Sequence, residues 1–144
     1  MIGLDTSFLV GLTIREHPTH EQCWRLFEEK ILGHEASAAI APQVLAEFAH
    51  VITDPRRFEQ PLDMLEATDI CKQWWHAAEC RALTPTPEAV NIFLAWMNRY
   101  RLGRKRILDT LLAATYHSAG VTRIASTNWR DFSCFDVFAI ELLQ

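Results

Sequence analysis

The first ten residues constrain the fold of this chain more than any other stretch of its sequence. Residues 2–4 form a short apolar run, typical of a buried strand, which ends abruptly at Asp5. Thr6 and Ser7 then offer hydroxyls before a second apolar run begins at Phe8. A strand, a carboxylate and a helix start in this order are typical of open α/β sheets, where reactive groups follow the carboxyl ends of central strands. An Asp at a helix start is also an ordinary N-cap, and taken alone that interpretation is the more common one.

Length and composition favour one folded domain. The chain has 144 residues, of which 49% are hydrophobic and 22% charged, and this balance is typical of globular proteins. The length suits one well-cored domain, so we expect a single domain over residues 1–144. No apolar run approaches the length of a membrane span, and no basic leader precedes the first one. We therefore expect a cytoplasmic protein that does not associate with membranes.

Charge and cysteine spacing exclude two classes of function. A net charge of −4 argues against a protein that coats nucleic acid through a general basic field, although it leaves room for a local basic patch. The cysteines are widely spaced and form no C-x-x-C pair, which favours buried free thiols over a zinc site. They are Cys23, Cys71, Cys80 and Cys134.

Apolar runs and helical patterns alternate along the rest of the chain. Further strands are predicted at 36–41, 81–84, 121–125 and 137–140, and helices at 7–15, 19–32, 42–52, 62–78, 87–100 and 107–118. The helix at 107–118 is apolar almost all round, which predicts burial on more than one side. Strands separated by helices imply a parallel sheet whose strands share one carboxyl edge.

Acidic residues occupy positions that such a sheet can bring to its carboxyl edge. Asp5 follows the first strand, and Glu47 lies at the margin of the apolar stripe in the helix at 42–52. Asp109 is in the first turn of the helix at 107–118, and Asp131 follows the strand at 121–125 in a polar loop. Taken singly, Glu47 is as well explained by a side chain that reaches solvent, and Asp109 by complementation of the helix dipole.

Carboxylates that converge repel one another and require a cation. A set of oxygen donors without organised His or Cys partners favours Mg²⁺ or Mn²⁺ over Zn²⁺. Such a site suits metal-assisted cleavage of phosphodiester bonds by a metal-activated water.

Four short motifs in the same order resemble those of the PIN-domain nucleases, and more narrowly those of the VapC-type toxin ribonucleases of prokaryotic toxin–antitoxin modules. They are Asp5-Thr-Ser, Glu47 in a helix after a Pro, Asp109 within Ile-Leu-Asp-Thr-Leu-Leu-Ala-Ala, and Thr127-Asn-Trp-Arg-Asp-Phe132. The resemblance covers essentially the whole chain.

The resemblance implies a Rossmann-like α/β/α fold of three layers, with a parallel sheet of about five strands in the order 3-2-1-4-5. It also implies endoribonuclease activity that depends on Mg²⁺, for which Mn²⁺ would substitute. The expected partners are RNA, a cognate antitoxin protein and a second copy of the chain in a homodimer.

The resemblance also assigns roles to residues of the four motifs. Asp5, Glu47 and Asp109 correspond to the acidic metal site, with Asp5 and Asp109 as direct ligands and Glu47 ligating directly or through water. Some members of the family carry an Asp where Asn128 or Trp129 stands here. We therefore assign the fourth acidic role to Asp131.

Polar side chains beside the acids are expected to support them. Asn128 would assist Asp131, while the hydroxyls of Thr6, Ser7 and Thr127 would hold carboxylates or water. A basic run precedes Asp109, and its last residues are Arg104, Lys105 and Arg106. These three are equally well explained as a lip that grips RNA phosphates and as a solvated helix end.

Other interpretations of the sequence remain open at this stage. One keeps the metal site but makes the substrate DNA or a structured RNA, in repair or RNA maturation. Another is a domain that binds nucleic acid or protein without cleaving, because Asn128 or Trp129 replaces an acid of some relatives. Trp74 and Trp75 are interpreted as core residues or as an exposed docking patch, and His17 and His20 as loop histidines near a helix start.

Overall fold

A five-stranded parallel sheet forms the centre of the computed structural model, which describes residues 1–142. The strands lie in the order β3-β2-β1-β4-β5, and every neighbouring pair is parallel, which confirms the predicted order. Their bounds are β1 (Ile2–Leu4), β2 (Ala38–Ile40), β3 (Cys80–Ala82), β4 (Arg123–Ala125) and β5 (Ala139–Ile140).

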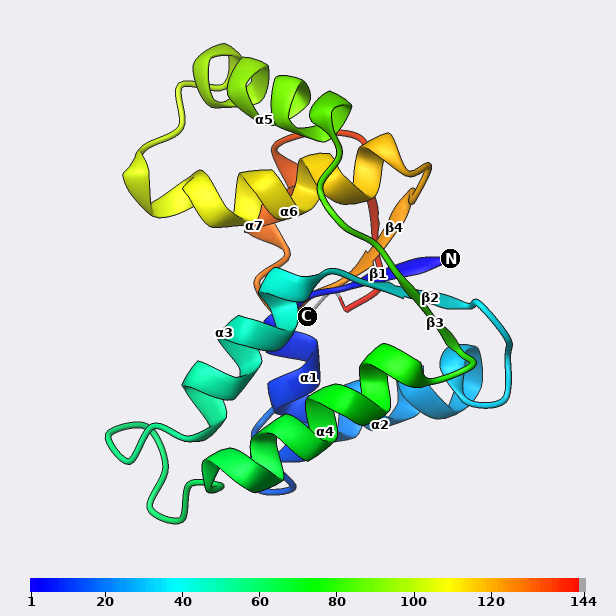
Figure 1. Cartoon of the computed structure of the whole chain (residues 1–144), viewed down its shortest axis with the longest axis vertical. Coiled ribbons are helices and arrows are strands. Elements are labelled where there is room, and N and C mark those ends of the chain that lie inside the picture. Colours follow the sequence, from blue (N-terminus) through cyan, green and yellow to red (C-terminus); the bar gives the residue numbers. More distant parts are fainter. Residues whose placement is uncertain (143–144) are drawn as a thin grey trace.

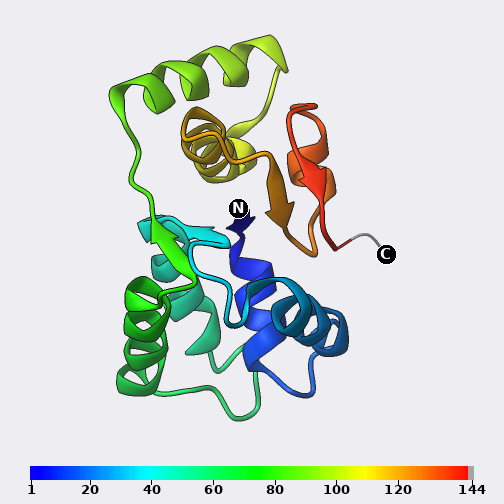
Figure 2. The ribbon, with the colours of Figure 1, turned by 90° about the vertical axis from the view of Figure 1, so that its right-hand side faces the viewer.

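Helices cover both faces of the sheet, so the predicted three-layer architecture is confirmed (Figures 1 and 2). One face carries α1 (Thr6–Thr13), α2 (His20–Leu26), α3 (Pro42–Ile52) and α4 (Met64–His76). The other face carries α5 (Pro87–Arg99) and α6 (Ile107–Ser118), which pack against each other. A short helix, α7 (Arg130–Ser133), connects β4 to β5.

The elements differ from the predicted ones mainly at their ends. β1 has the predicted bounds, whereas the other four strands are shorter than predicted, and the predicted polar loop after β4 contains α7. Thr19 precedes α2, but its side chain makes no capping hydrogen bond. The predicted burial of the helix at 107–118 on more than one side holds for the middle of α6, where residues 112–116 are buried. Its first turn is open to solvent, with Ile107 40% and Leu108 69% exposed.

The core confirms other expectations from the sequence. Both Trp74 and Trp75 are half-buried and pack against the core cluster, which favours their structural interpretation. All four cysteines are free thiols, as predicted, but the predicted burial holds only for Cys23: Cys71 and Cys80 are half-buried and Cys134 is exposed. None of the helices within residues 1–142 is long and apolar enough to cross a membrane.

Tyr116 of α6 fixes the strand that leads to Asp5. Its hydroxyl donates a hydrogen bond of 2.6 Å to the carbonyl of Leu4, and the residue is completely buried. The ring occupies the space beside Gly3, where an added Cβ would lie 2.7 Å from Cδ2 of the tyrosine. The close approach of α6 to β1 therefore requires a glycine at position 3.

Gly3→Ala is expected to destabilise the fold by about 1–3 kcal/mol, because the added methyl group forces the buried ring of Tyr116 out of its position. Urea denaturation measures this change. Gly103→Ala is the matched control, since nothing lies within 4 Å of the position of its added Cβ. Equal stability of the two variants would contradict the described packing of Tyr116 on β1.

Candidate active site

Asp5 lies at the carboxyl end of the central strand and is almost completely buried, with 5% of its surface exposed. Its backbone N–H donates to the carbonyl of Ala125, so the end of β1 is joined to the end of β4. Asp5 occupies the N-cap position of α1, but its side chain makes no capping hydrogen bond, so capping does not account for the carboxylate. The carboxylate is bound by two serine hydroxyls.

Ser7 and Ser126 each donate a hydrogen bond of 2.7 Å to Oδ2 of Asp5. The same two hydroxyl oxygens accept backbone N–H groups, from Thr127 at 2.9 Å and from Asn128 at 3.0 Å. Because each hydroxyl has one proton, accepting a backbone N–H leaves that proton to donate to the carboxylate. The loop after β4 therefore fixes the orientation of Asp5.

Burial is the main influence on the pKa of Asp5, and it raises that pKa. The hydrogen bonds from Ser7 and Ser126 lower it, and the charge of Glu47 raises it again. The protein thus keeps a carboxylate where its ionised form is poorly solvated.

Glu47 reaches the same region from α3. Thr6 at the start of α1 donates a hydrogen bond of 2.9 Å to Oε2 of Glu47, and its hydroxyl lies 3.4 Å from the carbonyl of Val44. Glu47 is exposed to solvent, yet it lines the pocket that contains Asp5. Of the two interpretations open for this residue, contact across a cleft describes its position.

Asp109 lies in the first turn of α6 and is half-buried. Its pKa is raised to about 7, first by burial and then by the charges of Asp5, Asp131 and Glu47, with a smaller opposing effect of Arg106. A carboxyl group with three acidic neighbours keeps its proton up to a higher pH, because ionisation would add another negative charge to the cluster.

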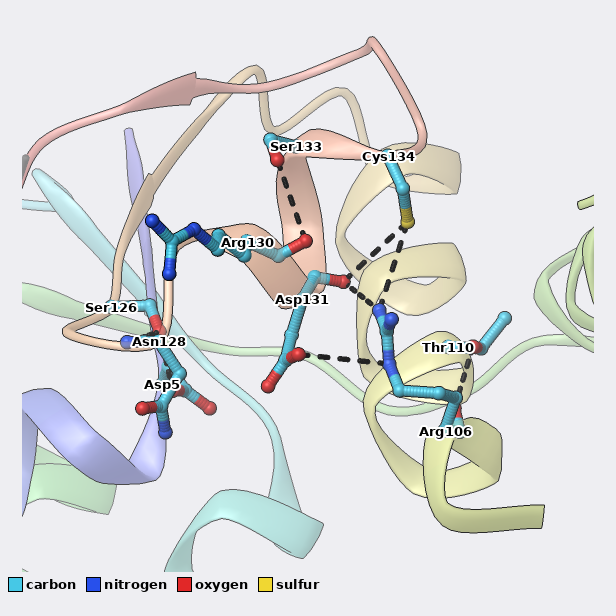
Figure 3. Close-up of polar contacts among 9 residues, drawn as sticks. All are labelled: Asp5, Arg106, Thr110, Ser126, Asn128, Arg130, Asp131, Ser133 and Cys134. Carbon is cyan, nitrogen blue, oxygen red and sulfur yellow. Dashed lines mark hydrogen bonds and ion pairs between the residues drawn. The ribbon is translucent and has the colours of Figure 1, made fainter. Parts of the chain in front are cut away.

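Arg106, the residue immediately before α6, reaches Asp131 of α7 with its side chain (Figure 3). Its guanidinium donates to the backbone carbonyl of Asp131, and its Nε lies 3.8 Å from Oδ1 of the same residue. A further contact of 3.7 Å joins the guanidinium to Sγ of Cys134. Arg106 therefore places the fourth carboxylate instead of extending freely toward solvent.

The other two residues of the predicted RNA-binding lip have a different environment. Arg104 and Lys105 are exposed in a short 3₁₀ turn, Arg104–Arg106, at the beginning of α6. Neither lines the pocket that contains the acids. An RNA-binding role for these two residues remains a prediction from the sequence.

One cavity of about 330 Å³ brings together the predicted metal ligands and the polar residues predicted to support them. Its lining includes all eight: Asp5, Thr6, Ser7, Glu47, Asp109, Thr127, Asn128 and Asp131. They come from β1, α1, α3, α6 and the segment after β4, because parallel strands place their carboxyl ends at one edge.

The chemistry of this donor set fits a hard divalent cation such as Mg²⁺ or Mn²⁺, which prefers carboxylate oxygens. Within residues 1–142, no three His, Cys, Asp or Glu side chains stand close enough together to hold one ion. Mg²⁺ usually binds through one or two carboxylates and keeps several waters, so it does not require three protein ligands. A structural zinc, which requires four protein ligands, does not fit.

Three polar residues with a place in this site were not predicted. Ser126 binds Asp5, while His17 and Arg57 line the cavity. A signal for Ser126 exists in the sheet register, because Leu4 pairs with Ala125 and the next residues are therefore neighbours. His17 and Arg57 lie in loops, whose course no periodicity of the sequence specifies.

Comparisons with known proteins agree on the fold of the chain. The family model described as PIN domain matches residues 2–137. Ribonuclease VapC24 of Mycobacterium tuberculosis is 25% identical over 135 residues, which are 94% of this chain and 91% of that protein.

Two solved structures share the architecture at lower identity. Mycobacterium tuberculosis VapC20, described as a sarcin-ricin loop cleaving toxin, is 19% identical, with a TM-score of 0.75 over the full length of both chains. A toxin–antitoxin complex from Klebsiella pneumoniae contains a chain that is 12% identical, with a TM-score of 0.64 and full coverage of both chains.

Proposed function

This chain belongs to the PIN-domain family, and from that premise we propose that it is an endoribonuclease that depends on Mg²⁺ or Mn²⁺ and acts as the toxin of a toxin–antitoxin module. The observation that carries this proposal is the gathering of four carboxylates, Asp5, Glu47, Asp109 and Asp131, around one cavity. Burial raises the pKa of Asp109 most, and the charges of Asp5, Asp131 and Glu47 raise it further; a divalent cation would relieve this repulsion among the acids.

In this proposal Asp5 and Asp109 bind the cation directly, and Glu47 binds it directly or through water. When bound, the cation supplies a Lewis acid for the phosphate and lowers the pKa of water in its shell. Ser7 and Ser126 hold the carboxylate of Asp5 in one orientation, so little reorganisation is needed on binding.

The remaining polar residues position these acids in the proposed reaction. Thr6 restrains Glu47 through its hydrogen bond to Oε2, and Arg106 restrains Asp131. Asn128 lines the cavity beside them and offers an amide to the substrate or to water.

A toxin role for this chain rests on its similarity to the VapC proteins and to the chain from the Klebsiella complex. The proposed partners are a cognate antitoxin and a second copy of the chain. Expression of the wild-type protein without an antitoxin is expected to arrest bacterial growth, whereas expression of Asp5→Asn is not. Equal growth arrest by both proteins would contradict a toxin role that depends on cleavage.

Cleavage of cellular RNA by the purified protein tests the proposed enzyme activity. We expect discrete fragments in the presence of Mg²⁺ or Mn²⁺, loss of cleavage with EDTA, and recovery when the metal is restored. Cleavage of DNA but not RNA would favour the repair interpretation. Folded, metal-loaded protein that cleaves neither would support the interpretation as a binding domain.

Ser126→Ala is expected to weaken Mg²⁺ binding by about tenfold, because residues that orient metal ligands typically contribute a factor of 10–100. The change removes one hydroxyl from Asp5 and leaves the N–H of Asn128 without its acceptor. Calorimetric titration with Mg²⁺ measures the affinity. Ser133→Ala serves as the control, since the hydroxyl of Ser133 contacts only the carbonyl of Arg130. Equal affinities would argue against the role of Ser126.

A further inference from the structure

The cavity extends beyond its acidic edge to a region lined by basic and apolar side chains. Helices α1 and α3 both begin at the carboxyl edge of the sheet and run away from it (Figure 1). Val10 and Val51 of these helices line the cavity, followed by His17 and Arg57 from the loops after them. Val10 is five residues beyond Asp5, which corresponds to about 7 Å along a helix. The side chains of His17 and Arg57, which can donate hydrogen bonds to an anion, therefore share the cavity with the carboxylates.

His17 is held by the residue two positions after it. Its Nδ1 accepts the backbone N–H of Thr19 at 3.2 Å and lies 2.8 Å from the hydroxyl of Thr19. A backbone N–H can only donate, so Nδ1 is unprotonated and the proton of the neutral ring is on Nε2. The imidazole thus presents one N–H donor from a side chain that lines the cavity.

Close packing between α1 and the start of α2 supports this arrangement. Thr19 is buried, and its hydroxyl lies against Gly11 of α1. A Cβ at position 11 would be 2.5 Å from Oγ1 of Thr19 and 2.8 Å from Sγ of Cys23. Gly11 therefore allows Thr19 to reach the position from which it holds His17.

Arg57 lies on an ordered turn after α3. The backbone N–H groups of Arg57 and Phe58 donate to the carbonyl of Asp54, and Phe58 packs against the core. The Nε of Arg57 lies 3.6 Å from Oδ2 of Asp54, and the side chain is 60% exposed. Because this contact uses Nε, the terminal nitrogens remain available as a fork for an anion.

We propose that His17 and Arg57 form a subsite for a backbone phosphate of the RNA, next to the phosphate that is cleaved. The inference rests on the proposed ribonuclease function and adds the part of the site that holds the strand. The four carboxylates of the cavity wall would repel RNA wherever a bound cation does not neutralise them, so a cationic side chain in the same cavity would add affinity for the strand. Arg57 offers a charged, bidentate contact to phosphate oxygens, and Nε2–H of His17 offers a neutral one.

This assignment differs from the one suggested by the basic run before α6. In that run, Arg106 donates a hydrogen bond to the backbone carbonyl of Asp131, and neither Arg104 nor Lys105 lines the cavity. Arg57, in contrast, lines the cavity, and within residues 1–142 the one ion pair of its side chain is the 3.6 Å contact with Asp54. Long, exposed ion pairs contribute little stability, so Arg57 can change partners at low cost.

Binding of a labelled single-stranded RNA, measured by fluorescence anisotropy in the uncleaving Asp5→Asn protein, tests the subsite. Arg57→Gln is expected to weaken binding on the order of tenfold and to reduce the salt dependence by about 0.7 in log–log slope, the value for one phosphate contact on a single strand. His17→Gln should weaken binding with a smaller change in slope. Arg56→Gln and His20→Gln are the matched controls.

The two controls remove the same kinds of side chain from positions outside the cavity, so they show whether a loss of RNA binding depends on where the side chain lies. Arg56 pairs with the same carboxylate as Arg57, also at 3.6 Å, but it is 92% exposed and does not line the cavity. His20 is the first residue of α2 and does not line the cavity. Its Nδ1 makes a hydrogen bond of 2.9 Å with the carbonyl of Gly11. Equal RNA affinity and salt dependence for Arg57→Gln and Arg56→Gln would overturn the subsite.

Failure of the subsite can be told apart from failure of the proposed function. If protein with an intact Asp5 cleaves RNA but Arg57→Gln and His17→Gln bind like their controls, only the subsite is wrong. If protein with an intact Asp5 neither cleaves nor binds RNA, the ribonuclease proposal fails and the subsite with it. Thermal melting of each variant verifies that a loss of binding does not reflect unfolding.

Discussion

Asp5→Asn is expected to reduce RNA cleavage by at least about 1,000-fold, because a bound metal ion supplies several kcal/mol of transition-state stabilisation. The amide keeps the size of the side chain and retains an oxygen that can accept hydrogen bonds from Ser7 and Ser126. It lacks the negative charge that holds a divalent cation. The loss is therefore expected in the catalytic rate, while the fold remains intact.

Single-turnover cleavage of RNA, with circular dichroism as the test of folding, measures this effect. Asp69→Asn is the matched control, since Asp69 is an exposed residue of α4 that does not line the cavity. We expect full activity from this control. If Asp5→Asn retained activity comparable to that of Asp69→Asn, the acidic cavity would not be the catalytic site.

Asp109→Asn is expected to abolish cleavage and, unlike most substitutions at a structured position, to stabilise the metal-free protein at alkaline pH. Burial and the charges of Asp5, Asp131 and Glu47 raise the pKa of Asp109 to about 7, whereas an unfolded aspartate titrates near about 4. Between these values the folded state binds more protons than the unfolded state. The contribution of Asp109 to stability therefore falls as pH rises from about 4 to about 7.

Replacement by Asn removes the charge responsible for this loss. Solvent screens part of the interaction, so we expect a gain of about 1 kcal/mol, or roughly 2–4 °C in Tm, at pH near 8 in EDTA. Thermal melts at pH near 5 and near 8 measure it, with a smaller gain expected at the lower pH. Mg²⁺ should stabilise the wild type more than Asp109→Asn. A variant that melts lower than the wild type under all these conditions would contradict the described electrostatics.

The sheet and the acidic site were predictable from the sequence because their signals are local and lie in consecutive elements. The apolar run before Asp5 and the Pro that begins α3 place Asp5 and Glu47 relative to the strands. A parallel sheet then brings the residues after its strands to one edge. The strand order itself came from the resemblance to a family and not from periodicity.

Other features depend on contacts between segments that are far apart in the sequence. Ser126 binds Asp5 across 121 residues of chain, and only the register of β1 with β4 reveals it. Arg106 contacts Asp131 through the geometry of α6 and α7, so its charge alone suggested a role on the surface. His17 resembled an ordinary loop histidine because the return of the α1–α2 loop to the cavity is a tertiary feature.

The central claim is that the carboxylates of this cavity bind a divalent cation, and anomalous X-ray diffraction from crystals grown with Mn²⁺ tests it most directly. We predict an anomalous peak within contact distance of Asp5 and Asp109, and its absence in crystals of Asp5→Asn grown in the same way. An ordered cavity without such a peak at saturating Mn²⁺, or a peak that persists unchanged in Asp5→Asn, would contradict the claim.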